Sequence, residues 1–289
     1  MRVALMIEGQ EGVTWEQWLA LARAAEDANL DGLFRSDHYR SIVRGDPAGS
    51  LDAWATLAGL AAVTTKLQLG TMVSPVTFRR VSVIAKLVTT VDHISNGRVE
   101  LGIGAGWFES EHEAYGFKFL STKERLDELD RQLEEVTRQW TDAPDIWPKP
   151  LQQPHPPIIV GGTAKPRTVR AAVRFADEYN TVFASVDEAR DRKRVLDEAA
   201  REAGREPLRF SLMTGCVVGR DERELQHRLE QFRTISGQDA PGISGTVDQV
   251  VAKLREYEEV GVERVMLQNL VHEDVEMVSV LGDVASHLR

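Results

Sequence analysis

Eight short apolar segments limit the possible folds of this chain more than any other feature. Each is followed by a stretch whose apolar residues recur at helical spacing. The segments are residues 2–7, 31–38, 66–75, 98–103, 158–162, 179–184, 208–218 and 263–270. They are apolar on both faces, which is typical of parallel strands covered by helices. Eight such units in a single domain, residues 1–289, predict a (β/α)8 TIM barrel. A doubly wound open sheet is the alternative, but residues 8–12 (EGQEG) lack the glycine fingerprint expected after its first strand.

Local signals mark where the helices begin and end. Three capping boxes predict helix starts, at Thr14 with Gln17, Ser121 with Glu124, and Ser185 with Glu188. Ser50 is expected to cap the helix that carries Trp54. Asn96 and Gly97 supply the left-handed residues that end a helix. The proline-rich residues 144–157 predict an extended surface connector, because proline interrupts both helices and ladder hydrogen bonds.

Charge and composition narrow the class of protein. With 35 basic and 45 acidic residues the net charge is −10, and no basic stripe is present, so we expect neither nucleic acid nor an anionic membrane as a partner. The single cysteine, Cys216, cannot form an internal disulfide and is expected to be an inert buried thiol, as suits a reducing cytosol. No segment approaches the roughly 20 apolar residues of a transmembrane helix. We therefore expect a cytoplasmic protein that acts on a small molecule.

The active site of a barrel forms at the carboxyl ends of its strands. Those ends are residues 8, 36–38, 71–74, 104–107, 161–163, 183–184, 214–215 and 268–269. Asp37 and His38 are the most reactive pair, because a histidine with a pKa near ~6.5 exchanges protons at neutral pH; the alternative is that His38 only holds a loop. No ligand spacing predicts a metal site, and no G-x-S-x-G elbow predicts a serine nucleophile.

The other histidines are weaker candidates. His93 lies near a helix end, where a packing or dipole role is expected. His112 follows a glycine-rich turn and is open to either a structural or a ligand role. His155 lies between prolines and is expected to be solvated.

Two groups of glycines also lie at strand ends. Gly102, Gly104 and Gly106 follow one strand, and Gly161 with Gly162 end the next. Glycine in such places lets a ligand touch the backbone, although it also serves tight barrel corners. Met72, Val73 and Trp107 supply apolar contacts for a ring system. The combination favours a ligand with a phosphate or a flat ring.

Several segments, in order along nearly the whole chain, resemble one family. They are residues 36–39 (SDHY), 69–75 (LGTMVSP), 79–80, 85–86, 91–111, 148–162, 176–180 and 245–250. The chain resembles the luciferase-like monooxygenase superfamily, and within it the deazaflavin oxidoreductases that use coenzyme F420.

This resemblance implies the site residues. His38 would be the catalytic proton donor or acceptor, and the Met72–Val73 peptide would be cis. The residues implied to bind the cofactor are Asp37, His38, Met72, Val73, Ser74, Gly106, Trp107, Ser110, Glu111, Gly161, Gly162, Asp177 and Asn180.

The chain departs from the family pattern in places. Val81 stands where proline is common, and Trp107 where some deazaflavin sugar dehydrogenases have a catalytic glutamate. Glu111 is either a substitute acid or a first-turn residue placed by the helix dipole. The connector between Trp140 and Pro148 lacks about a dozen residues found in many relatives, which affects any subunit contact carried over there.

The resemblance implies hydride transfer between F420 and a small organic substrate, with His38 moving the proton. An FMN-dependent monooxygenase of the same superfamily is the alternative, and a non-catalytic flavin-binding protein is a third reading. The resemblance also implies a homodimer. Substrate contacts are expected from loops 9–12, 39–49 and 236–245, but the sequence does not indicate which substrate they bind.

Overall fold

Strands and helices alternate along the computed structural model, which describes residues 1–45 and 47–289; Asp46, in the loop 39–49 expected to meet substrate, lies outside the described residues. The strands are β1 Arg2–Ile7, β2 Gly32–Arg35, β3 Gln68–Thr71, β4 Ser74–Pro75, β5 Val99–Gly104, β6 Ile158–Gly162, β7 Glu178–Val182, β8 Arg209–Gly219, β9 Ile243–Thr246 and β10 Arg264–Gln268. The helices are η1 Gly9–Glu11, a 3-10 turn, and α1 Trp15–Asp27, α2 Ala53–Val63, α3 Val81–Ser95, α4 Glu109–Tyr115, α5 Thr122–Thr141, α6 Pro166–Phe175, α7 Val186–Glu202, α8 Glu222–Ser236, α9 Val247–Glu259 and α10 Val275–Leu288.

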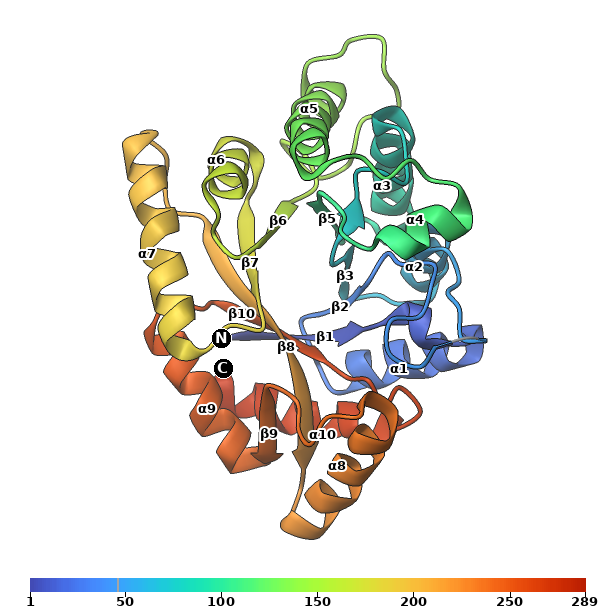
Figure 1. Ribbon diagram of the computed structural model, residues 1–289, viewed down its shortest axis with the longest axis vertical. Helices are drawn as coiled ribbons and strands as arrows, with labels where there is room; N and C mark the ends of the chain where they lie inside the picture. The colour runs from blue at the N-terminus through green and yellow to red at the C-terminus, as the bar shows by residue number, and fades with distance from the viewer. Residues whose placement is uncertain (46) are drawn as a thin grey trace.

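Eight parallel strands close into a barrel, with the helices outside it (Figure 1). Their order is β10, β1, β2, β3, β5, β6, β7, β8, and β8 pairs with β10 to complete the circle. The predicted (β/α)8 barrel is confirmed. Each of the eight segments predicted to be strands contributes one strand to the barrel. The residues at their carboxyl ends therefore gather on one rim.

Two strands differ from the sequence prediction. The expected strand 66–75 is divided into β3 and β4, and the Met72–Val73 peptide between them is cis. β9 forms at the end of the range 236–245, which was expected to be a loop, and pairs with the last residues of β8, from Cys216 with Ile243 to Gly219 with Thr246. β8 is therefore long enough to pair with β7 and β10 in the barrel and to extend beyond its rim.

The helix caps follow the predicted chemistry with one correction. The capping boxes at Thr14, Ser121 and Ser185 are present. Asn96 and Gly97, with φ of 56° and 81°, end α3 as predicted. The prediction of Ser50 as a cap is wrong, because α2 is capped by the Asp52 carboxylate, which accepts a 2.9 Å hydrogen bond from the Ala55 amide. The Ser50 hydroxyl instead accepts a hydrogen bond from Arg35.

The core has two layers because alternate strand residues face opposite sides. On β1, Val3, Leu5 and Ile7 pack toward the helices, whereas Ala4 and Met6 belong to the cluster inside the barrel. Cys216 is buried in the outer layer, and burial raises the pKa of its thiol to about 12. The thiol is therefore protonated and unreactive at neutral pH.

A buried ion network lies inside the barrel near the amino ends of the strands. The Arg264 guanidinium donates hydrogen bonds to Glu100 at 2.7 and 3.0 Å and to Glu178 at 2.7 and 3.1 Å, and all three residues are almost fully buried. This network occupies the end of the barrel opposite the strand ends that carry function, so its role is structural.

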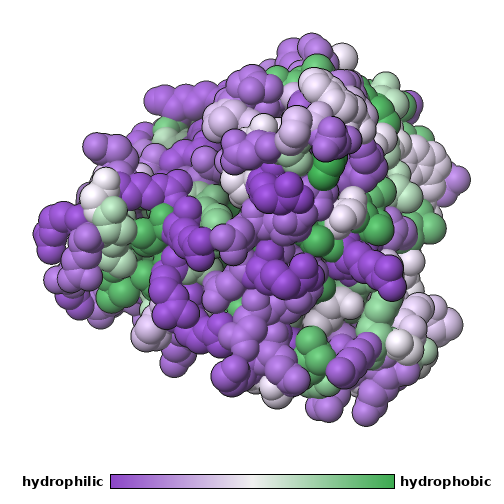
Figure 2. Space-filling view, turned by 90° about the horizontal axis from the view of Figure 1, so that it is seen from above, coloured by the Kyte–Doolittle hydropathy of each residue, from purple (hydrophilic) through white to green (hydrophobic). Residues whose placement is uncertain are grey.

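The outer surface is largely polar. The face in Figure 2 is mostly hydrophilic, with hydrophobic side chains in groups between the charged ones. Among the described residues, none of the helices is both long and apolar enough to cross a membrane.

Candidate active site

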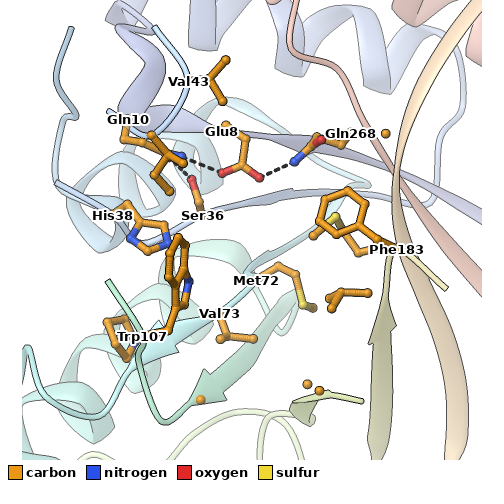
Figure 3. A pocket seen from close by; sticks show the side chains of 18 of the residues that line it. Glu8, Gln10, Ser36, His38, Val43, Met72, Val73, Trp107, Phe183 and Gln268 are labelled. Atoms are coloured by element: carbon orange, nitrogen blue, oxygen red, sulfur yellow. Dashed lines mark hydrogen bonds between the residues drawn. The ribbon is translucent and has the colours of Figure 1, made fainter. Parts of the chain in front are cut away.

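A cavity of about 650 Å³ opens at the carboxyl ends of the barrel strands (Figure 3). Residues from β1, β2, β3, β5, β6, β7, β8 and β10, or from the loops that follow them, contribute to its lining. The polar side chains of the lining are Glu8, Gln10, Ser36, His38, Thr168, Gln238 and Gln268. The larger apolar ones are Ile42, Val43, Met72, Val73, Trp107, Leu129, Val182, Phe183, Met213, Phe232 and Leu270. The cavity is thus mostly apolar with a few polar groups, as small-molecule sites are.

His38 lies on the wall of this cavity and is held by Glu111. Its Nδ1 lies 2.9 Å from Oε2 of the Glu111 carboxylate, which is fully buried. Burial would lower the pKa of His38, but the hydrogen bond and the negative charge of Glu111 outweigh burial and raise that pKa above its ordinary value of 6.5. Since Nδ1 is committed to Glu111, Nε2 is the ring nitrogen left to exchange a proton with a ligand.

Glu111 also fixes the chain next to His38. Its Oε1 accepts hydrogen bonds from the backbone amides of Tyr39 and Arg40. Burial would raise the pKa of Glu111, but its hydrogen bonds with His38, Arg40 and Tyr39 lower it, so the group is an anion. Glu111 therefore orients the imidazole and supports its protonated form. The sequence alone left open whether Glu111 is a substitute acid or a first-turn residue placed by the helix dipole.

A second buried carboxylate holds the continuation of this loop. Glu11 accepts hydrogen bonds from the amides of Ile42, Val43 and Arg44 and from the Ser41 hydroxyl, at 2.6 to 3.1 Å. Two of these loop residues, Ile42 and Val43, line the cavity.

Asp37 is 1% exposed and is not part of the cavity lining. Its carboxylate accepts hydrogen bonds from Arg79 at 2.6 and 3.2 Å and from the Ser74 hydroxyl at 2.6 Å. Arg79 also donates to Asp52 at 2.7 Å and to the Tyr39 hydroxyl. Asp37 and Ser74, both predicted to bind the cofactor, therefore act in this structure behind the wall, where they fix the turn that presents His38.

The glycines separate into two groups. A Cβ on Gly102 would lie 1.9 Å from the Thr71 carbonyl oxygen, and one on Gly104 would lie 2.7 Å from Val73 Cγ2, so these two glycines are required by packing between β5 and the chain after β3. Gly104 also lines the cavity, together with Gly161 and with Gly106 and Gly162, whose φ are 79° and 156°. At Gly161 a Cβ would meet no atom closer than 3.7 Å, so its backbone borders open space.

Three predicted cofactor residues lie elsewhere. Asp177 precedes β7, at the amino end of the barrel, where its carboxylate accepts a 2.8 Å hydrogen bond from the Ile158 amide; its predicted place beside the cavity is wrong. Asn180 points into the barrel interior and donates to Ser211 at 2.8 Å. Ser110 is partly buried on α4 and does not line the cavity. These three residues were implied by the resemblance, which did not reveal which way their side chains face.

The three other histidines considered from the sequence, His93, His112 and His155, have structural partners. His93 Nε2 lies 2.8 Å from the Lys149 carbonyl oxygen, as the expected packing role requires. His112 is 1% exposed and is bonded at both nitrogens, to Thr77 and to the Phe108 carbonyl. His155 is partly buried beside Trp140, with ring centroids 5.9 Å apart, so it is less solvated than expected. Within residues 1–45 and 47–289, no group of three or more His, Cys, Asp or Glu side chains is arranged to hold a metal ion.

The sequence match decides the family. Residues 1–241 match the family model described as luciferase-like monooxygenase. The chain belongs to the luciferase-like monooxygenase family. This is a family of oxidoreductases and monooxygenases, and sequence relatives of this chain are named as FMNH2-dependent or F420-dependent enzymes.

Individual relatives of this luciferase-like chain are distant. An uncharacterized protein of Mycobacterium tuberculosis is 31% identical over 173 residues, covering 55% of this chain and 59% of that protein. The FMNH2-dependent dimethylsulfone monooxygenase of Pseudomonas putida is 26% identical over 204 residues, covering 66% and 55%. The matches thus span less than two thirds of these relatives. An F420-dependent secondary alcohol dehydrogenase, solved with an F420–acetone adduct, superposes with a TM-score of 0.82 over 100% of this chain and 99% of that one, at 18% identity, which shows the shared fold.

Sequence reasoning missed part of the polar wall of this luciferase-like site. Glu8, Ser36 and Gln268 were recognised only as strand-end residues, and Gln10 only as part of the loop 9–12 expected to contact substrate. These four side chains form one hydrogen-bonded group across β1, β2 and β10 (Figure 3). Their strand-end positions were a usable signal, but their mutual contacts depend on closure of the barrel.

Proposed function

We propose that this protein is an oxidoreductase that transfers a hydride between coenzyme F420 and a small organic substrate. The observation that carries the proposal is the His38–Glu111 pair on the wall of a mostly apolar 650 Å³ cavity at the strand ends. Such a pair supplies a proton donor and acceptor next to a space that fits a ring and a substrate. The bound deazaflavin would supply the hydride acceptor or donor.

The lining fits a flat ring with a phosphate-bearing tail. Met72, Val73 and Trp107 present apolar surface to the cavity, and the Gly106 and Gly161 backbones border it without side chains. The backbone amides that follow Pro166 in the first turn of α6, including that of Thr168, would suit a phosphate group. These residues would hold the cofactor, with Asp37 and Ser74 supporting the wall from behind.

His38 would move the proton that accompanies hydride transfer. When an alcohol is oxidised, a hydride leaves its carbon and the hydroxyl proton passes to Nε2 of His38. In the reverse direction the protonated ring gives that proton to the carbonyl oxygen. Because Glu111 raises the pKa of His38, it stabilises the imidazolium that forms when His38 accepts the proton.

Cofactor titration tests this proposal. Protein freed of cofactor is titrated with F420 and, separately, with FMN, while cofactor and tryptophan fluorescence are followed. Tight binding of F420 with substrate-dependent bleaching of its absorbance supports the proposal. Tight FMN binding without F420 binding favours the monooxygenase alternative instead, and cofactor binding without turnover across a broad substrate panel favours a flavin-binding protein.

The predicted homodimer is likewise a proposal. Apolar side chains that are exposed on α3 and on the connector after α5, namely Val83, Ile94 and Trp147, would be covered by a second copy. Light scattering after size-exclusion chromatography measures the mass directly, and a monomer at micromolar concentration would contradict the dimer.

A further inference from the structure

The wall of the cavity opposite the glycines carries one carboxylate, that of Glu8. Figure 3 shows it between Gln10 and Gln268, on the same side of the cavity as Ser36. Its Oε1 accepts a 2.5 Å hydrogen bond from Gln268 Nε2, and its Oε2 accepts a 2.8 Å hydrogen bond from Gln10 Nε2. Both oxygens are therefore acceptors, as in the ionised carboxylate.

The orientation of this carboxylate is set by a directed series of hydrogen bonds. The Gly9 amide, which can only donate, bonds to Ser36 Oγ at 3.1 Å. The Ser36 hydroxyl then donates to Gln10 Oε1, which turns the Gln10 amino group toward Glu8. A carboxylate has about four acceptor positions, so two amide donors leave Glu8 able to accept more hydrogen bonds from a ligand.

The charge of Glu8 and its surroundings favours a substrate that carries a hydrogen-bond donor over one that carries an acidic group. Lysine and arginine are absent from the described lining of the cavity, whose other titratable side chain, His38, is already paired with Glu111. The Arg35 guanidinium lies outside the lining and is bonded to Ser50 and to the Ser36 and Leu51 carbonyls. A carboxylate or phosphate on a substrate would thus meet Glu8 without a lining cation to offset the repulsion.

We propose that Glu8 selects the substrate of this site, which takes a largely apolar molecule bearing a hydroxyl or ammonium donor and rejects one bearing an acidic group there. The reaction that the selected substrate undergoes rests on the proposed function. The preference for a hydrogen-bond donor over an acidic group does not. Apolar contacts to the substrate come from residues such as Val43, Met213 and Leu270. Glu8 supplies the polar contact that distinguishes between different polar groups on the same apolar frame.

Three probes of one carbon frame test this selection: cyclohexanol, cyclohexylamine and cyclohexanecarboxylate. Their affinities are measured by titration calorimetry near pH 7 on F420-loaded protein. Wild type is expected to bind the alcohol and the ammonium at least about tenfold more tightly than the carboxylate, since hydrogen bonds to a charged group have about that effect. Equal or tighter binding of the carboxylate by wild type overturns the proposal without any variant.

Variants assign the preference to Glu8. In Glu8→Gln and Glu8→Ala the ratio of ammonium to carboxylate affinity is expected to fall about tenfold or more. Glu113→Gln removes an exposed carboxylate outside the cavity and should leave the ratio unchanged. An unchanged ratio in both folded Glu8 variants, or an equal fall in Glu113→Gln, contradicts the assignment.

The same probes separate this inference from the proposed function. If F420 does not bind, the hydride-transfer proposal fails, and the probe ranking is then measured on FMN-loaded or cofactor-free protein. A preserved donor preference there still supports the role of Glu8. A flat ranking on protein that binds and turns over F420 refutes the role of Glu8 alone.

Discussion

Nδ1 of His38 lies 2.9 Å from Oε2 of Glu111, although 73 residues separate them in the chain. The contact joins the end of β2 to the start of α4, and the same carboxylate binds the Tyr39 and Arg40 amides. The imidazole is therefore fixed in position and in tautomer by one buried group. Five expectations follow from this pair and from the residues that hold the cavity wall in place.

His38→Ala should keep cofactor binding but lower turnover by about 10²–10⁴, which is the usual contribution of a positioned proton donor. The change removes a ring from the cavity wall without removing the apolar residues that would contact a cofactor. Steady-state kinetics with F420 and a cofactor titration measure the two effects. His227→Ala, an exposed histidine on α8, is the matched control. Full activity in His38→Ala would exclude the catalytic role.

Glu111→Gln should shift the pH profile. Because folding raises the pKa of His38, the ring stays protonated to higher pH than a free histidine. Carbonyl reduction, which needs the protonated ring, should decline at lower pH in the variant than in wild type. The rate of reduction as a function of pH measures this. If the rate of reduction declines at the same pH in the variant and in wild type, another group controls the rate.

The same substitution should make stability depend on pH differently. The pKa of His38 is higher in the folded protein than its ordinary value of 6.5, so protonation of His38 stabilises the fold. This contribution is complete below pH 6.5 and is lost as the pH rises through the folded pKa of His38. The lowered pKa of Glu111 contributes above 4.5 and is lost as the pH falls through its folded value. The difference in melting temperature between wild type and Glu111→Gln should thus be larger near about pH 6 than near about pH 9. A difference that grows from about pH 6 to about pH 9 contradicts this assignment.

Arg79→Met should destabilise the fold by about 3–5 kcal/mol, because it leaves the buried Asp37 carboxylate without its cation. Urea unfolding measures the free energy. Adding Asp37→Asn should recover part of the loss, since a neutral amide does not need a counter-charge. Arg138→Met removes an exposed ion pair with Glu135 and should change stability by less than about 1 kcal/mol. Equal effects of the two arginine changes would contradict a special role for Arg79.

Gly102→Ala should destabilise the protein by about 1–3 kcal/mol, because its Cβ would overlap the Thr71 carbonyl oxygen. The strain falls on the chain that leads to Met72, so cofactor affinity should weaken as well. Gly49→Ala is the control, because no atom lies within 4 Å of its added Cβ. Unfolding curves and cofactor titrations of both variants decide the matter, and a neutral Gly102→Ala would disprove the packing requirement.

The barrel could be predicted because its signals are local. Apolar strand segments, capping boxes and the Asn96–Gly97 helix end each depend on a few neighbouring residues, and the structure confirms them. The choice between Ser50 and Asp52 as a cap could not be made in this way, because both residue types accept the same hydrogen bond. In the structure Asp52 caps α2, and the Ser50 hydroxyl accepts a hydrogen bond from Arg35 at the end of β2.

The candidate site was less predictable because its contacts join distant segments. His38 could be found from its place at a strand end, but its pairing with Glu111 could not, since that contact depends on where α4 lies relative to the end of β2. Asp177 was misplaced because its role was taken from the resemblance, although the predicted strand 179–184 already put it at the amino end of the barrel. Likewise, the roles of Gly102 and Gly106 differ only through what stands opposite each of them.

The loop from residue 38 to residue 44 is tied down by Glu11 and Glu111 mainly through its backbone amides. Backbone amides are the same whatever side chain a residue bears. Ile42 and Val43 can therefore be exchanged for other side chains while the loop keeps its path and His38 keeps its place. The reacting group and the shape of the binding surface can thus be altered independently, which makes positions 42 and 43 natural targets for redirecting this barrel to new substrates.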